Sequence, residues 1–220
     1  MLFSELVEII DPDPHPAPLN MAIDEALLRH AERPTLRIYR WSEPAVSFGY
    51  FGNFAAARET AAGRALVRRW TGGGLVEHGD DLTYTLVVPR EHGFCRHNAS
   101  ESYRSIHEGI ARALAAGAIS AELLPEERAP LSSACFISPV RYDLVAAGTK
   151  VAGAAQRRTR WGLLHQGSIQ INADPTDLRE NLADAFSHRL TSMHLPLEIR
   201  AAAEALTHSK YGTAAWLEKF

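Results

Sequence analysis

RRWTGGGLVEHGDDLTYTLVVP, residues 68–89, places three successive glycines between two arginines and a histidine. A glycine run costs backbone entropy, so it indicates a need for positive φ or for close approach of the main chain. The spacings of the P-loop and of the dinucleotide-binding fingerprint are both absent. The glycines alone would suit a surface hinge. With Arg69 as a guanidinium fork beside bare backbone N–H groups, they would also suit a ligand that carries a phosphate or carboxylate.

Strands are predicted on both sides of the glycines, at 65–70 and at 81–89, from their alternating apolar residues. The other predicted strands are 35–41, 45–51 and 162–172, and residues 142–158 are expected to form a hairpin that turns near Gly148. The four prolines between 12 and 18 indicate an extended connector before the first helix.

That first helix is predicted over 20–31, with Asn20 as its N-cap and with Asp24 and Glu25 in early turns that favour acidic residues. Further helices are expected over 53–62, over 100–116 with Gly117 as C-cap, after Asp174-Pro175, and from about 197. Strands and helices interleave without a regular βαβ period. The pattern therefore favours an α+β fold with a mixed, largely antiparallel sheet flanked by helices.

The composition is that of a globular protein, with 220 residues of which 46% are hydrophobic and 22% are charged. We expect a single catalytic domain over 1–220 without a C-terminal accessory domain. The net charge of −3 gives no overall attraction to nucleic acid or to an anionic membrane. Arginines do cluster around Arg69 and Arg157, which suits a small anionic ligand or an acidic protein partner. Two cysteines, no signal-peptide pattern and no membrane-length apolar run favour a cytoplasmic location.

Lys150 stands in GTKVAGAAQ, residues 148–156, among unusually small side chains. A solvent-exposed strand lysine is the usual interpretation of such a residue. The succession of Gly153, Ala154 and Ala155, however, indicates a strand that packs against something thin, and an acyl chain would fit. Lys150 is therefore a candidate catalytic residue.

Cys135 is a candidate nucleophile, although a free cysteine is more often a small buried hydrophobic residue. As a nucleophile it would need a nearby cation to stabilise its thiolate, and Lys150 is the expected supplier. Cys95 has no partner at zinc-ligand spacing, so no metal site is predicted there. His78 taken alone is most simply a structural histidine, while His165 is expected to bring a polar group to the same pocket as Gly167.

Five ordered segments together resemble the lipoate–protein ligase and octanoyltransferase family, whose fold is shared with biotin–protein ligases. They are LNMAIDEALL (19–28), LRIYRWSEPAVSFGYF (36–51), RRWTGGGLVEHGDDLTY (68–84), YDLVAAGTKVAGAAQRR (142–158) and LLHQGSIQIN (163–172). The resemblance implies an acyl pocket without a metal, in which Lys150 contacts the acyl carbonyl. It assigns substrate contacts to Arg69, Thr71, Gly72, Gly73, Gly74, His78, Tyr84, Asp143, Gly153, Ala154, Ala155, Gln156, His165, Gln166, Gly167 and Ser168.

The family contains two chemistries, and three features of the chain favour the transferase. The ligase pattern Asp-x-Gly-Asn after the histidine is absent, because residues 79–82 are Gly-Asp-Asp-Leu. Cys135 stands upstream of Asp143 and Lys150, where the cysteine-dependent branch carries its nucleophile, and the chain ends near 220. Two departures from the family pattern, Gly52 in place of a frequent glutamine and His-Gln-Gly at 165–167, leave individual acyl contacts open.

On this interpretation an octanoyl or lipoyl group passes from acyl carrier protein, through a Cys135 thioester, to a lysine of a lipoyl domain. The acceptor would be the glycine cleavage H protein or a 2-oxoacid dehydrogenase E2, and no cofactor would be required. One alternative is a lipoate–protein ligase that uses ATP and magnesium and forms a lipoyl-adenylate. A second alternative is a non-catalytic relative that binds lipoyl domains.

Overall fold

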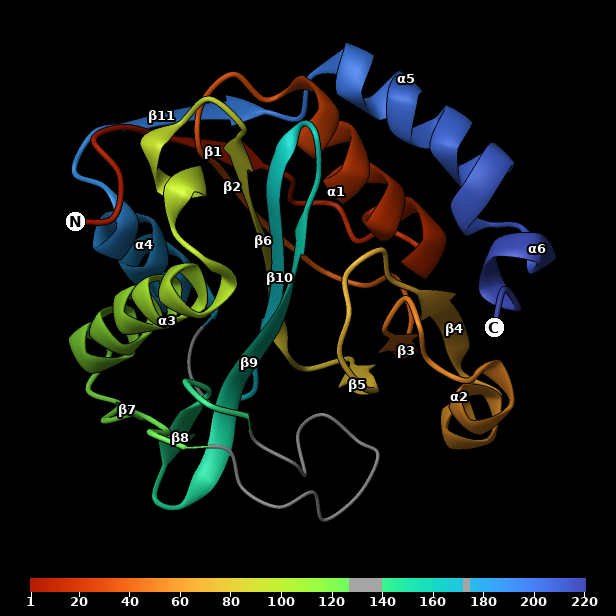
Figure 1. Ribbon diagram of the computed structural model, residues 1–220, viewed down its shortest axis with the longest axis horizontal. Coiled ribbons are helices and arrows are strands. Elements are labelled where there is room, and N and C mark those ends of the chain that lie inside the picture. Colours follow the sequence, from red (N-terminus) through yellow and green to blue (C-terminus); the bar gives the residue numbers. More distant parts are fainter. Residues whose placement is uncertain (127–139, 172–174) are drawn as a thin grey trace.

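The computed structural model describes residues 1–126, 140–171 and 175–220, which form two β-sheets and the helices around them (Figure 1). The larger sheet has the strand order β11-β1-β2-β6-β10-β9-β8-β7. Its strands are β1 (Leu6–Ile10), β2 (Thr35–Tyr39), β6 (Leu82–Pro89), β7 (Glu122–Leu123), β8 (Leu144–Ala146), β9 (Thr149–Arg158), β10 (Gly162–Ile169) and β11 (Leu190–His194). β1 runs parallel to both β2 and β11, and the other neighbours are antiparallel. The predicted mixed, largely antiparallel sheet is confirmed.

Helices cover both faces of the larger sheet, and Figure 1 shows them on opposite sides of it. On one face lie α3 (Ala99–Ala116) and α4 (Pro175–Phe186), and on the other lie α1 (Ala17–His30) and α5 (Leu197–Leu206). Adjacent residues of β6 show the alternation: Leu86 packs in the α3–α4 core and Val87 in the α1–α5 core. The central strands are therefore buried on both faces. The chain also contains the short helical segments η1 (Gly93–Arg96), η2 (Thr207–Tyr211) and α6 (Ala214–Leu217).

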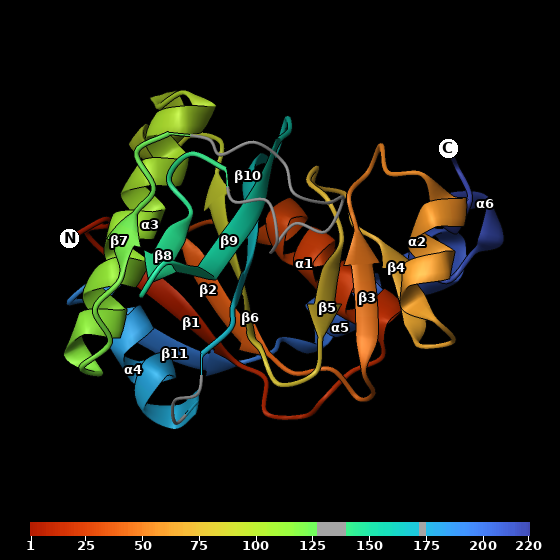
Figure 2. The ribbon, with the colours of Figure 1, turned by 90° about the horizontal axis from the view of Figure 1, so that it is seen from below.

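A smaller sheet of β3 (Ala45–Phe48), β4 (Ala65–Arg68) and β5 (Val76–His78) stands beside the larger one, with α2 (Phe54–Ala61) packed on it (Figure 2). The glycines therefore connect β4 to β5. The prediction that they join strands 65–70 and 81–89 directly was wrong, because β4 and β6 belong to different sheets. At three residues, β5 is too short for its apolar alternation to be recognised.

The start of the first helix also differs from the prediction. α1 begins at Ala17, inside the proline segment, because Pro16 and Pro18 flank a first helical turn whose N–H groups need no intrahelical partner. Asn20 is not the N-cap: it is buried within the helix, and its amide donates to the carbonyls of His15 and Arg40. Asp24 and Glu25 are fully buried in the middle of the helix rather than exposed near its start.

Two other predicted elements are confirmed. The hairpin formed by β8 and β9 turns at Ala147 and Gly148, both with positive φ. Helix α3 ends at Gly117 as predicted, and a capping box between Asn98 and Glu101 fixes its beginning. Among the described residues, no helix is both long and apolar enough to cross a membrane.

Candidate functional site

A cleft of about 440 Å³, counting its open mouth, lies between the small sheet and the strands β6, β9 and β10 of the large sheet. The segments that carry the predicted site residues meet there, as the five-segment pattern required. Nine predicted residues line it: Arg69, His78, Lys150, Gly153, Ala154, Ala155, Gln166, Gly167 and Ser168. Six further lining residues were not predicted: Met21, Tyr39, Trp41, Ser47, Val76 and Thr83.

The glycine segment combines the two properties expected of a glycine run. Gly73 has φ of +87°, a conformation that side chains disfavour. Its carbonyl oxygen also lies only 2.0 Å from the position that a Cβ on Gly49 would take, so two stretches of main chain are in close contact. The Arg69 guanidinium fixes this segment by donating to the carbonyls of Gly72 (3.0 Å) and Gly74 (2.9 Å).

A directed chain of hydrogen bonds runs from Arg69 along the cleft wall. Arg69 can only donate, and it donates to Ser47 Oγ (2.7 Å). Asp81 Oδ2 accepts from His78 Nδ1 (2.9 Å), and in the tautomer protonated at Nδ1 alone His78 Nε2 accepts the hydroxyl proton of Ser47 (2.6 Å). Burial raises the pKa of Asp81, but hydrogen bonds led by that of His78 outweigh it and lower the pKa overall. Both nitrogens of His78 are thus used, which confirms the structural interpretation of this histidine within the cleft wall.

Thr71, which directly precedes the three glycines, is linked by hydrogen bonds to helix α1. Its hydroxyl donates to Gln166 Oε1 (2.8 Å), and Gln166 Nε2 donates to Asp24 Oδ2 (2.7 Å) on α1. Asp24 also accepts from Arg37 Nη1 (2.8 Å). Because Gln166 faces the cleft, this residue both orients the glycine segment and forms part of the wall.

Lys150 is buried and paired, so the solvent-exposed interpretation was wrong. Its ammonium lies 2.7 Å from Asp143 Oδ2, and the two side chains are 3% and 0% exposed. The backbone N–H of Val140 also donates to Oδ2 (2.8 Å), while the Tyr103 hydroxyl donates to Oδ1 (2.5 Å). Gly153 provides the space for the ammonium, since a Cβ there would lie 2.6 Å from Lys150 Nζ.

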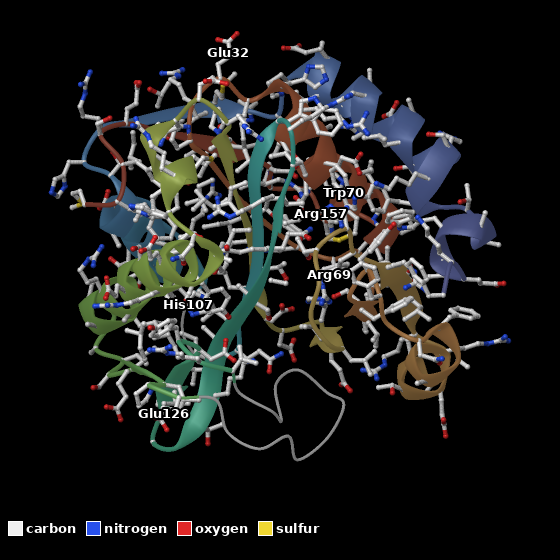
Figure 3. The ribbon with its side chains drawn as sticks, viewed as in Figure 1. Glu32, Arg69, Trp70, His107, Glu126 and Arg157 are labelled. Atoms are coloured by element: carbon white, nitrogen blue, oxygen red, sulfur yellow. The ribbon has the colours of Figure 1, made fainter. Side chains whose placement is uncertain are left out.

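Three predicted contacts point away from the cleft. Tyr84, Gln156 and His165 lie on the α3 face, where His165 Nε2 meets the Tyr84 hydroxyl (2.9 Å) and Nδ1 meets Gln156 Nε2 (3.0 Å). Burial lowers the pKa of His165 well below its ordinary value, so the ring is neutral. Figure 3 shows His107 on this side of β9 and Arg69 on the other. These residues support the cleft wall from behind.

Of the two cysteines, Cys135 lies outside the described residues and Cys95 lies within them. Cys95 is half-buried beneath the end of β6, where its Sγ is 3.3 Å from the Pro89 carbonyl oxygen, and burial raises the pKa of its thiol. Cys95 does not line the cleft, in agreement with its interpretation as incidental.

Comparison with known proteins places this geometry in context. The family model of the lipoyl protein ligase A/B catalytic domain matches residues 16–206. The octanoyltransferase LipM of Kyrpidia tusciae is 40% identical over an alignment of 179 residues, and the match covers 74% of this chain and 65% of that protein. The octanoyltransferase LipM of Oceanobacillus iheyensis is 33% identical over an alignment of 216 residues, and the match covers 89% of this chain and 79% of that protein. The chain thus spans about two thirds to four fifths of the length of these relatives.

Two solved structures share the fold. A lipoate-protein ligase A bound with ATP superposes with a TM-score of 0.78 at 21% identity, covering 97% of this chain and 98% of that one. A bi-partite lipoate protein ligase from Thermoplasma acidophilum, described with its E2 lipoyl domain, gives a TM-score of 0.74 at 17% identity, covering 99% and 98%. At these identities the likeness concerns the fold alone.

Proposed function

Because the chain belongs to the lipoyl protein ligase A/B catalytic-domain family, we propose that it is an octanoyltransferase of protein lipoylation. It takes an octanoyl group from acyl carrier protein and transfers it to a lysine of a lipoyl domain. The shared name of the relatives at 33% and 40% identity supports the octanoyl group. The lipoyl domain described with the Thermoplasma ligase supports the class of acceptor.

The observation that carries the proposal is the cleft itself. Its polar wall residues bond to one another through the Arg69–Ser47–His78–Asp81 chain, which leaves small and apolar surfaces for a ligand. One buried charged pair, Lys150–Asp143, lies beside the smallest of these surfaces, at Gly153. An apolar surface beside the buried Lys150–Asp143 pair suits an alkyl chain that ends in a reactive carbonyl.

The proposed reaction has two acyl transfers. The Cys135 thiol gives up its proton, and the thiolate attacks the carbonyl carbon of the octanoyl thioester. The new C–S bond to Cys135 forms, the C–S bond to the donor breaks, and the donor thiolate takes up one proton in exchange. The ε-amine of the acceptor lysine then attacks the enzyme thioester, the C–N bond forms, and Cys135 is released as the amine loses a proton. Thioesters are already activated, so the sequence of steps uses no ATP.

Lys150 stabilises negative charge during both transfers. Its ammonium is held by Asp143, beside Gly153 on the cleft wall. Cys135 precedes Val140 by only five residues in the sequence, and the Val140 N–H donates to the same Asp143 oxygen as Lys150. This short connection supports the assignment of Cys135 as the nucleophile that Lys150 serves.

Two alternatives make different predictions. A lipoate–protein ligase would require lipoate, ATP and magnesium, and would modify the acceptor without a cysteine thioester. A non-catalytic relative that binds lipoyl domains would modify nothing. The buried Lys150–Asp143 pair disfavours this alternative, because apolar residues could replace a charged pair without a catalytic role at little cost in stability.

The test is mass spectrometry of the protein mixed with octanoyl-carrier protein alone. We expect one octanoyl adduct, removable by neutral hydroxylamine, and its transfer to a lipoyl domain added afterwards. Cys135→Ser should abolish the adduct, whereas Cys95→Ser, the matched control, should behave as wild type. Modification of the lipoyl domain by Cys135→Ala with lipoate and ATP would instead establish the ligase.

A further inference from the structure

A group of basic residues stands on aromatic rings beside the cleft, at the outer end of β9. Gly153 and Ala155 line the cleft, and Arg157 is the next residue on the same face of that strand. The Arg157 guanidinium lies 4.8 Å from the ring centres of both Tyr50 and Trp70, and it donates to the Trp70 carbonyl (3.0 Å). Figure 3 shows Trp70 and Arg157 next to Arg69 of the cleft wall.

Three further cations adjoin Arg157. Arg160 lies over the Trp161 ring at 4.3 Å and Arg29 lies 4.9 Å from the same ring, while Lys210 lies 4.2 Å from Trp70. We call Arg29, Arg157, Arg160 and Lys210, with the rings of Tyr50, Trp70 and Trp161, the basic surface. It joins the end of the β9–β10 hairpin to the glycine segment.

The cations of the basic surface outnumber the carboxylates that pair with them. Glu25 accepts from both Arg29 and Lys210. Arg157 and Arg160 form no ion pair with any residue in the described part of the chain. Four cations thus share one carboxylate, in a protein whose net charge is −3. Such a local excess creates a field that attracts an acidic partner.

The form of the surface fits a protein better than a small anion. Arg29 and Arg160 are exposed and both lie close to the Trp161 ring, and a guanidinium carries a fork of donors that matches a carboxylate. Arginine and large aromatic residues are also the types enriched in protein interfaces. A protein that delivers an acyl chain must remain outside the cleft while its thioester enters, and the basic surface adjoins the cleft wall along β9.

We infer that the basic surface docks the acidic face of the protein that carries the acyl thioester. This inference rests on the proposed function, in which a carrier protein is the donor. It assigns to Arg157 and Arg160 the recognition of the carrier, separate from the chemistry at Lys150.

The experiment compares two donors, octanoyl-carrier protein and octanoyl-pantetheine, which presents the same thioester without a protein. Arg160→Glu and Arg157→Gln should each raise the KM for the carrier by about tenfold, and leave acylation by octanoyl-pantetheine within about twofold of wild type. Arg58→Glu, the same charge reversal at an exposed arginine of α2, is the matched control and should change neither. The carrier reaction of wild type should slow with added salt, and that of an Arg157→Gln/Arg160→Glu double variant should not.

Three results would overturn the inference. Equal slowing with both donors would show that these arginines support the cleft. A raised KM for the lipoyl domain, with that for the carrier unchanged, would assign the surface to the acceptor. Calorimetry of the unacylated carrier measures docking directly, even if wild type transfers from neither donor. Unchanged affinity for the carrier in the double variant would refute docking at the basic surface. Absence of transfer from either donor by wild type would instead refute the proposed function.

Discussion

The Lys150 ammonium is held 2.7 Å from the Asp143 carboxylate in a site from which solvent is almost excluded. Removal of one partner leaves the other charge buried, which typically costs about 3–5 kcal/mol in the free energy of unfolding. Lys150→Met should therefore abolish octanoyl transfer and also destabilise the fold. A Lys150→Met/Asp143→Leu variant should recover stability in urea unfolding but no activity. Recovery of transfer by the double variant would show that Lys150 is structural only.

Gly153→Ala should displace the Lys150 side chain. The added methyl would lie 2.5 Å from Cε and 2.6 Å from Nζ of Lys150, closer than carbon and nitrogen atoms can approach. We expect the rate of thioester formation to fall by about tenfold or more, equivalent to at least about 1.4 kcal/mol in the barrier. Gly93→Ala is the control, because its nearest new contact is an Arg96 side chain in η1, away from the cleft. Wild-type rates for Gly153→Ala would contradict the packing argument.

Tyr103→Phe should loosen the Lys150–Asp143 pair without touching either residue. The hydroxyl donates to Asp143 and accepts from the Ala154 N–H (2.9 Å), and loss of a hydrogen bond to a charged group costs about 1.5–3 kcal/mol. We expect lower stability and slower thioester formation, since one of the hydrogen bonds that hold the Asp143 carboxylate beside Lys150 is lost. The control is Tyr142→Phe, whose hydroxyl makes no hydrogen bond within the described residues. Equal rates of thioester formation for both variants would refute a role for Tyr103.

His107 should make the fold sensitive to mild acid. Burial lowers the pKa of His107 to about 4, its Nδ1–H donates to the Tyr142 carbonyl (2.7 Å), and its Nε2 has no partner among the described residues. Because the unfolded pKa is near 6.5, the unfolded state binds the proton first, and stability falls as the pH drops from about 6.5 toward 4, by up to about 3 kcal/mol.

Urea unfolding between pH 7 and pH 5 measures this effect. The free energy of unfolding of wild type should decline more steeply than that of His107→Phe, because the carboxylates contribute equally to both proteins. Parallel curves for the two proteins would show that His107 is not protonated on unfolding.

Local patterns predicted much of the fold. The Gly148 turn, the Gly117 end of α3 and the strand around Leu86 each follow from neighbouring residues alone. The strands β1 and β11, which lie at one end of the larger sheet, were not predicted. Met193 of β11 is exposed, and the strand has no clear alternation that would reveal its pairing with β1. Strands of this kind form because a neighbouring strand is available, which no local pattern reports.

The residues of the candidate site were likewise predicted only in part. Lys150 and the glycines were found because they are unusual residues in their own segments. Ser47 was missed, since its importance comes from a partner far away in sequence, His78, 31 residues further on. His165 was placed on the cleft face, but the strand alternates, and Gln166 takes that position.

A single rigid strand, β9, joins Lys150 to Arg157. From residue 150 to residue 157, at about 3.3 Å per residue, the chain spans roughly 23 Å. If the carrier docks at Arg157 as inferred, the length of β9 sets the distance that the flexible arm of the donor must cover to bring its thioester to Lys150. Carriers with a shorter arm should dock yet fail to acylate, so the length of a strand, in addition to the shape of the cleft, would select the substrate.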